Sequence, residues 1–218
     1  MNVKKIAGLA TGLCLFGSVA IANAATYELN FDVLEVNGAP DIGSSYSMFL
    51  TDEEAWTIKI ANNDGTYDSE IADIYFDDNT SVFTNITFDD GTGVDFTSPT
   101  SPPDLSGGQN LEPPFDATYS AGSASPSELK DPEINDGEYI TFSGTLDGGL
   151  DALMAAIWSG DFRVGLKIQS INCPPEDSRC DYDGASQTYV NQVPLPGAVW
   201  LFGSAILGFA AFSNRRKV

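Results

Sequence analysis

The 218-residue sequence contains no histidine. Without an imidazole the chain cannot build a Ser-His-Asp triad, a Cys-His pair or a histidine-ligated metal site. Neither a Gly-x-Ser-x-Gly nucleophile motif nor a glycine-rich phosphate loop is present. A glycosidase needs two carboxylates, but among 31 acidic residues some pair always qualifies, so this signal has little specificity. The sequence therefore predicts a protein that is not an enzyme.

Basic residues are scarce and lie mostly at the ends of the chain. Lys and Arg total 10 against 31 Asp and Glu, which gives a net charge of −21. Half of the basic residues are terminal: Lys4, Lys5, Arg215, Arg216 and Lys217. Every acidic residue lies between these ends, and such a surface repels phosphate backbones, so we expect no nucleic-acid partner. Hydrophobic residues still make up 42% of the chain, which favours a folded domain over disorder.

The N-terminus has the three parts of a secretory signal peptide. Lys4 and Lys5 precede an apolar run over residues 6–21, and small residues follow at Ala22 and Ala24. We expect signal peptidase to remove residues 1–24 and leave Ala25 as the new N-terminus. An uncleaved membrane anchor is the alternative.

The C-terminus has the pattern of a membrane-spanning segment. The apolar stretch from Leu195 to Phe212 has 18 residues. As a helix it would be about 27 Å long, close to the lower limit for a bilayer core of about 30 Å. We place the transmembrane helix at 198–212, and the basic cluster Arg215, Arg216 and Lys217 should stop transfer and stay in the cytoplasm. The part of the chain before the helix would then lie outside.

A short proline motif precedes this helix. Pro194 and Pro196 disfavour helix at the residue before each, which would hold the motif extended at the membrane surface. The series Val193, Pro194, Leu195, Pro196 and Gly197, the apolar helix and the basic tail closely resemble the PEP-CTERM sorting signal over residues 193–218. The opening is Val-Pro-Leu-Pro in place of Pro-Glu-Pro. An ordinary junction between a stalk and a single-pass helix is the alternative.

The resemblance implies a route and a set of partners. A membrane-embedded protease, exosortase, would cleave near the proline motif of a protein exported from a Gram-negative bacterium. The chain would be anchored briefly in the inner membrane and then reach the cell surface or the medium. Proteins with this signal are associated with exopolysaccharide and biofilm matrix, so exopolysaccharide is a candidate partner.

Only three cysteines are present, and Cys14 falls inside the expected signal peptide. In an exported chain the remaining two, Cys173 and Cys180, are expected to form a disulfide. Closing so short a loop stabilises by about 2.5 kcal/mol. A zinc site would need two more soft ligands, which the mature sequence lacks.

Residues 25–192 are predicted to form one all-β ectodomain, an antiparallel β-sandwich. Apolar and polar residues alternate in several short stretches, most regularly over 162–169, where Phe162, Val164, Leu166 and Ile168 share one face. Turn signals such as Asn37-Gly38 separate the stretches. The other face of each strand is expected to meet solvent.

Two segments depart from this pattern. Apolar residues at helical spacing from Leu150 to Trp158 predict one short amphipathic helix, capped by Asp147 and ended by Gly160, with Trp158 in the core. Residues 99–136 are rich in Pro, Ser and Gly, which predicts a long, loosely ordered loop. A break into two domains there is the alternative, although too few strands follow it to form a second sandwich.

Acidic clusters in the turns raise the question of a metal. We interpret Asp77-Asp78-Asn79 and the similar groups at 62–65, 89–91 and 181–184 as turn formers on a solvated surface. Weak calcium binding is the alternative, with no ligand assigned. We therefore expect no cofactor and leave the metal open.

The sequence thus favours a structural, non-catalytic protein of the cell surface or extracellular matrix. The alternative is a polysaccharide-binding β-sandwich at the same location, possessing exposed aromatic side chains and stabilised by calcium. Four aromatic residues are candidates for such a platform, Trp56, Tyr67, Tyr75 and Tyr139. The alternation places Trp56 toward the core and Tyr75 toward solvent.

Overall fold

The structure, a computed structural model, describes residues 26–51, 56–62, 67–90, 95–101, 103–123, 139–173, 177 and 184–191. The segments that carry the expected signal peptide, sorting motif, transmembrane helix and basic tail lie outside these residues, as does Cys180. Within the described ranges no helix is both long enough and apolar enough to cross a membrane.

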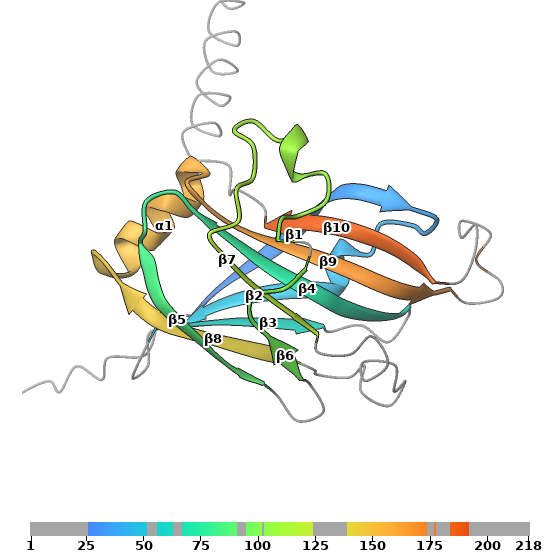
Figure 1. Cartoon of the computed structure of the whole chain (residues 1–218), viewed down its shortest axis with the longest axis horizontal. Helices are drawn as coiled ribbons and strands as arrows, with labels where there is room; N and C mark the ends of the chain where they lie inside the picture. Colours follow the sequence, from blue (N-terminus) through green and yellow to red (C-terminus); the bar gives the residue numbers. More distant parts are fainter. Residues whose placement is uncertain are drawn as a thin grey trace, which may run out of the picture.

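Ten antiparallel strands form one sheet (Figure 1). Their order is β5-β8-β3-β2-β1-β10-β9-β4-β7-β6. The strands are β1 (Thr26–Asn37), β2 (Tyr46–Thr51), β3 (Trp56–Asn62), β4 (Asp68–Asp78), β5 (Phe83–Asp90), β6 (Phe96–Thr97), β7 (Tyr119–Ser123), β8 (Tyr139–Leu146), β9 (Phe162–Asn172) and β10 (Ala185–Asn191). The prediction of an antiparallel, all-β fold is confirmed for the described residues.

Strand β1 belongs to two layers of this sheet. Its first half pairs with β2, from Thr26 to Asn30, and its second half pairs with β10, from Phe31 to Asn37. We call β5-β8-β3-β2 with the start of β1 the first layer, and the end of β1 with β10-β9-β4-β7-β6 the second layer. The arrangement fits a β-sandwich in which both layers are parts of one continuous sheet. At its open side, Phe96 N donates to Asp90 Oδ2 at 3.4 Å and links the two edge strands.

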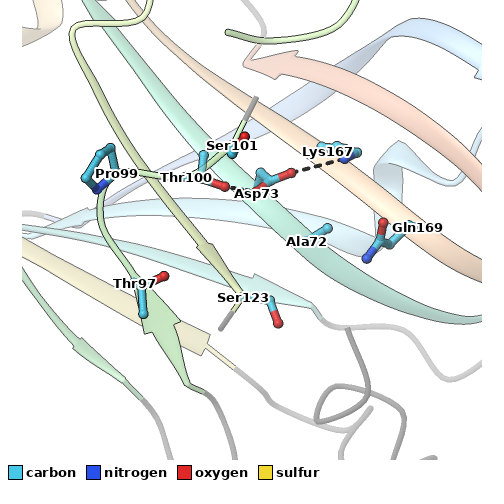
Figure 2. A pocket seen from close by; sticks show the side chains of 9 residues that line it. All are labelled: Ala72, Asp73, Thr97, Pro99, Thr100, Ser101, Ser123, Lys167 and Gln169. Atoms are coloured by element: carbon cyan, nitrogen blue, oxygen red, sulfur yellow. Dashed lines mark hydrogen bonds and ion pairs between the residues drawn. The ribbon is translucent and has the colours of Figure 1, made fainter. Parts of the chain in front are cut away.

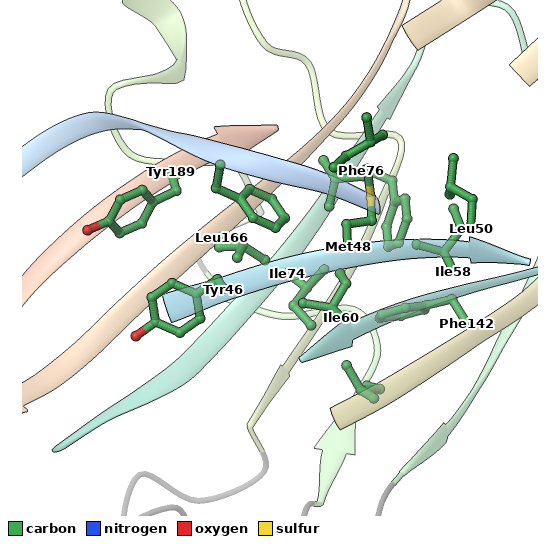
Figure 3. Close-up of a cluster of buried hydrophobic side chains, with 14 of the residues drawn as sticks. Tyr46, Met48, Leu50, Ile58, Ile60, Ile74, Phe76, Phe142, Leu166 and Tyr189 are labelled. Atoms are coloured by element: carbon green, nitrogen blue, oxygen red, sulfur yellow. The ribbon is translucent and has the colours of Figure 1, made fainter. Parts of the chain in front are cut away.

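The main core lies between the layers (Figure 3). Met48, Ile58 and Ile60 enter it from the first layer, opposite Ile74 and Leu166 of the second. The rings of Phe76 on β4 and Phe142 on β8 meet edge to face, with centroids 4.8 Å apart, and so join the layers directly. As predicted, Phe162, Val164, Leu166 and Ile168 are all fully buried.

The opposite face of the second layer is covered, contrary to expectation. Tyr75, predicted to be exposed, is completely buried in a second cluster with Leu105 and Phe115. Leu105 and Phe115 come from the segment 103–118, which lies over the outer side of the second layer. Gly165 leaves the space that this segment needs, because a Cβ there would lie 2.6 Å from Leu105 Cδ2.

The Pro-rich stretch is therefore more ordered than predicted, at least over 103–123. It contains a short 3₁₀ helix, η2 (Gly108–Asn110), and strand β7, which pairs with β4. Its remainder, residues 124–138, lies outside the described residues. A second 3₁₀ helix, η1 (Gly43–Ser45), connects β1 to β2.

The predicted helix is present as α1 (Gly149–Ser159). It ends at Gly160, which has a φ of 80° and donates its N–H to the carbonyls of Ala156 and Ile157. The expected cap at Asp147 is wrong, because the capping residue is Gly148, without a side-chain hydrogen bond. The expectation that Trp158 is core is also wrong, since it is 53% exposed. Ile157 lies at the centre of the buried face, and the next residue is turned about 100° away from it.

Candidate functional site

Charged and amide side chains face one another across β4 and β9 on the outer side of the second layer. The pairs follow from the register: Glu70 with Gln169, Asp73 with Lys167, and Asp77 with Arg163. Register shifts between Asp68 and Glu70 and between Ile71 and Asp73 keep these polar residues outward while Ile71 and Ile74 face the core.

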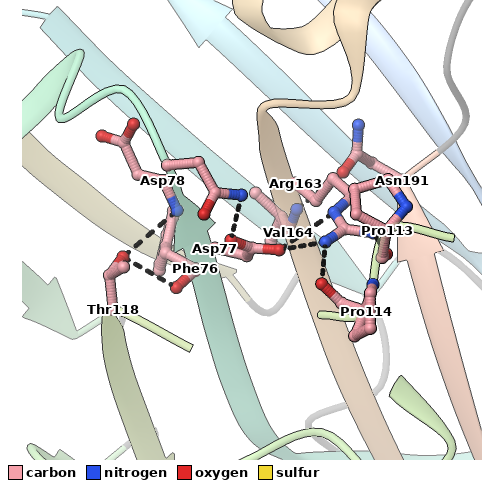
Figure 4. A network of polar contacts seen from close by, with 10 residues as sticks. Phe76, Asp77, Asp78, Pro113, Pro114, Thr118, Arg163, Val164 and Asn191 are labelled. Atoms are coloured by element: carbon pink, nitrogen blue, oxygen red, sulfur yellow. Dashed lines mark hydrogen bonds and ion pairs between the residues drawn. The ribbon is translucent and has the colours of Figure 1, made fainter. Parts of the chain in front are cut away.

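The Asp77–Arg163 pair is a structural contact (Figure 4). Asp77 is fully buried and its carboxylate receives Nε of Arg163 at 3.0 Å and also Nη2. The same guanidinium donates to the carbonyl oxygens of Pro113 and Pro114, both at 2.7 Å. Burial raises the pKa of Asp77 and the Arg163 partner opposes that rise. With all these contacts made, the pair fastens the 103–118 segment to the sheet.

The neighbouring acid, Asp78, organises the turn from β4 to β5. Its carboxylate accepts the backbone N–H groups of Thr80, Val82 and Phe83 at 3.2, 3.1 and 2.8 Å. Asn79 Nδ2 donates to Asp77 Oδ1 at 2.9 Å. The Asp78 oxygens hold the backbone of the turn, as expected of a turn former, but Asp77 and Asp78 are buried, so the expectation that this cluster lies on a solvated surface is wrong. In the described part of the chain no group of three or more acidic or cysteine side chains could hold a metal ion.

A polar hollow opens at the other end of the same face (Figure 2). It encloses about 370 Å³ and is lined by Ala72, Asp73, Thr97, Pro99, Thr100, Ser101, Ser123, Lys167 and Gln169. At its floor Lys167 Nζ lies 3.3 Å from Asp73 Oδ2, and Thr100 Oγ1 donates to Asp73 Oδ1. Asp73 is nearly buried, whereas the Lys167 side chain is 30% exposed, so Lys167 is the charged group that a ligand can reach.

Hydrogen bonds to β7 position the rim. Ser98 Oγ donates to the carbonyl of Ser120 at 2.7 Å, and Thr100 N donates to Ser120 Oγ at 3.3 Å. Gly122 permits this close approach, because a Cβ there would overlap both Thr100 Oγ1 and Asp73 Oδ1. The rim is thus held in place over the floor.

The hollow suits hydrogen bonding better than acid–base chemistry. Among its lining residues Asp73 is the one carboxylate, and both of its oxygens already have partners. The carboxylate pair of a glycosidase is not formed by these lining residues. Hydroxyl, amide and ammonium groups remain as donors and acceptors for a polar ligand.

The four aromatic candidates differ in how far their side chains are exposed to solvent. Tyr75 is buried, Trp56 is half-buried, and half-buried Tyr67 donates its hydroxyl to Asp177 at 2.5 Å. Tyr139 is 41% exposed on the outer side of the first layer, with Lys59 Nζ 3.9 Å from its ring centroid. Of the four aromatic candidates in the alternative interpretation, Tyr139 alone is exposed.

Only one of the two cysteines in the predicted disulfide lies within the described residues. Cys173 follows β9, is partly buried and packs against the main core. Cys180 lies outside the described residues, so the pairing stays a prediction.

No family model matches this chain, and no curated protein or solved structure matches it. Any function must therefore be argued from the residues themselves.

Sequence reasoning did not find the hollow. The alternation did place Lys167 and Gln169 on the outward face of their strand and Asp73 on that of another. What it lacked was the pairing of β4 with β9 and the return of the 97–101 segment over both, which depend on long-range contacts.

Proposed function

We propose that this chain is an exported, exosortase-processed protein of the cell surface or extracellular matrix, with a structural and non-catalytic role. The observation that carries the proposal is the C-terminal series: Val193 to Gly197, then the apolar stretch, then Arg215, Arg216 and Lys217. The N-terminal pattern ending at Ala24 supports the same route.

The described fold is compatible with this role. Three of its buried charged groups, Asp77, Asp78 and Arg163, are used in holding loops to the sheet. Many other acids are exposed, among them Glu28, Asp32, Glu35, Asp89, Asp104, Glu112, Asp116 and Asp151. An exterior of one sign keeps copies of the protein apart and hydrated, which suits a component of a gel-like matrix.

The test is the intact mass of protein recovered from the outer surface and from the medium. We expect an N-terminus at Ala25 and a C-terminus near Pro196. Replacing Pro194 and Pro196 together by Ala should leave the tail on the protein, while the control Pro132→Ala should be processed normally. Surface protein of wild-type sequence that still extends to Val218 would overturn the proposal.

A second candidate, a polysaccharide-binding module, is favoured by the outer side of the first layer. There the strand register places one hydroxyl side chain from each of five neighbouring strands in a row across the sheet. The residues in this row are Thr26, Thr51, Thr57, Ser143 and Thr87. Exposed Tyr139 stands on the same side and could stack on a sugar ring. Saturable binding to the host's exopolysaccharide that is lost in Tyr139→Ala would support this candidate, and binding unchanged in that variant would exclude this surface.

A further inference from the structure

We infer that the hollow on the second layer binds a neutral, hydroxyl-rich ligand of the carbohydrate class. This inference deepens the proposed function and rests on it for one point, that the ligand is met outside the cell. The site is on the opposite side of the sandwich from Tyr139, on the other layer, so it is independent of the second candidate surface.

The size of the hollow fits a small polar ligand. Its volume of about 370 Å³ lies within the range of small-molecule sites, about 300–1,000 Å³. Its floor is built on paired central strands and its rim is fastened to β7, so the walls are preorganised. A preformed site loses little conformational freedom when a ligand binds.

The lining offers both donors and acceptors in a small space. Lys167 has three N–H groups and one contact at 3.3 Å, to Asp73. Gln169 uses Nε2 to donate to Glu70 Oε1 at 2.7 Å, and its carbonyl oxygen is an acceptor beside Lys167. Thr97 and Ser101 are exposed at the rim, and each contributes a hydroxyl group. A sugar hydroxyl both donates and accepts, so it can satisfy groups of either kind.

Two buried oxygens belong to residues that neighbour the floor in the sheet without lining the hollow. Glu70 is 3% exposed and Thr188 is 5% exposed. Glu70 Oε2 and Thr188 Oγ1 have no hydrogen-bond partner among the described residues. Glu70 pairs across the sheet with Gln169, and Thr188 pairs with Lys167, so both residues are neighbours of floor residues. Buried oxygens in folded proteins are nearly always satisfied, by protein, by water or by a ligand.

Charge selects a neutral ligand. Lys167 and Asp73 together carry no net charge at the floor. The whole chain has a net charge of −21, so an acidic polymer would be repelled before it reached Lys167. A cationic ligand would compete with Lys167 for Asp73, whose oxygens already have partners.

The test uses calorimetric titration of protein purified after expression of the full chain. The probes are neutral gluco-, manno- and galacto-tetrasaccharides and, for comparison, the tetrasaccharide of galacturonic acid. We expect saturable binding of at least one neutral probe. Lys167→Met, which removes a charged donor, should weaken it about tenfold, and Ser101→Trp, which fills the hollow from its exposed rim, should abolish it.

Lys59→Met is the matched control, because it removes a lysine from the first layer, on the opposite side of the sandwich, and it should bind as the wild type does. Circular dichroism and melting curves show whether each variant is folded, and Ser101→Trp supplies an independent result if Lys167→Met is unstable.

Three outcomes would overturn the inference: no binding of any neutral probe, preference for the galacturonic acid probe, or binding that is lost in Lys59→Met and retained in Ser101→Trp. In each of these cases processing at Ala25 and Pro196 would leave the proposed function standing. Failure of processing with binding intact would remove that function and keep the site.

Discussion

Arg163 on β9 and Asp77 on β4 form an ion pair that solvent hardly reaches, with side-chain exposures of 7% and 0%. The Arg163 guanidinium also holds the carbonyls of Pro113 and Pro114, and it lies 5.3 Å from the ring centroid of Phe115. One side chain thus connects two central strands to the segment that covers them.

Replacing Arg163 by Met should be strongly destabilising. The change leaves the Asp77 carboxylate buried without its counter-ion, which costs about 3–5 kcal/mol of unfolding free energy in comparable cases. Urea unfolding measures the loss, and limited proteolysis should show cleavage within 103–118. The control Lys167→Met breaks a more exposed ion pair and should cost no more than about 1 kcal/mol. Equal losses in the two variants would contradict the clamp role of Arg163.

Gly165→Val should displace the covering segment. The new Cβ would lie 2.6 Å from Leu105 Cδ2 and 3.2 Å from Phe115 Cζ, so the segment must move outward. Overpacking of this kind costs about 1–3 kcal/mol. We expect a lower melting temperature and faster proteolysis of 103–118, whereas Ser143→Val, on the outer side of β8, should leave both unchanged. A Gly165→Val protein as resistant as the wild type would show that the segment adapts.

Asp78→Ala should loosen the turn between β4 and β5. Three backbone N–H groups lose a charged acceptor, and we expect a loss of roughly 2–4 kcal/mol of unfolding free energy. The control is Asp89→Ala on the exposed side of β5, which should stay within about 0.5 kcal/mol of the wild type. Denaturant unfolding compares them, and a neutral Asp78→Ala would mean that solvent replaces the carboxylate.

Asp90 should make stability depend on pH. Burial raises the pKa of its carboxyl above the ordinary 3.8, and Asp95 and Asp89 raise it further. The folded state then binds the proton more tightly than the unfolded state does. The stabilising contribution is therefore complete below pH 3.8 and is lost as pH rises through the raised pKa. Asp90→Asn cannot ionise, so its unfolding free energy should match that of the wild type below pH 3.8 and should exceed it increasingly as the pH rises. A pH-independent difference between the two proteins would refute this assignment.

The two neighbouring residues at the end of α1 should respond very differently to truncation. Ile157 is fully buried, so Ile157→Ala should cost about 2–5 kcal/mol of unfolding free energy. Trp158 is 53% exposed, so Trp158→Ala should remain within about 0.5 kcal/mol. Thermal melts of both variants check this. A large loss of stability in Trp158→Ala would mean that Trp158 packs in the core.

Much of the fold is readable from local patterns. The alternation over 162–169 identified the core-facing residues of β9, and helical spacing identified α1 with its end at Gly160. These succeed because the side a residue takes on a strand or helix follows from backbone geometry alone. The sorting pattern at 193–217 is likewise carried by neighbouring residues, and it stays a prediction.

The sequence by itself therefore determined several of the strands, the position of the helix and the core-facing side chains of β9, because those depend on neighbours in the chain. Only the tertiary structure decided what lies over the outward-facing ones. Tyr75 is buried because the 103–118 segment returns over it, and Asp73 meets Lys167 because β4 pairs with β9. The period-two pattern states which side of a strand a residue occupies, but it contains no information on which distant segment packs against that side.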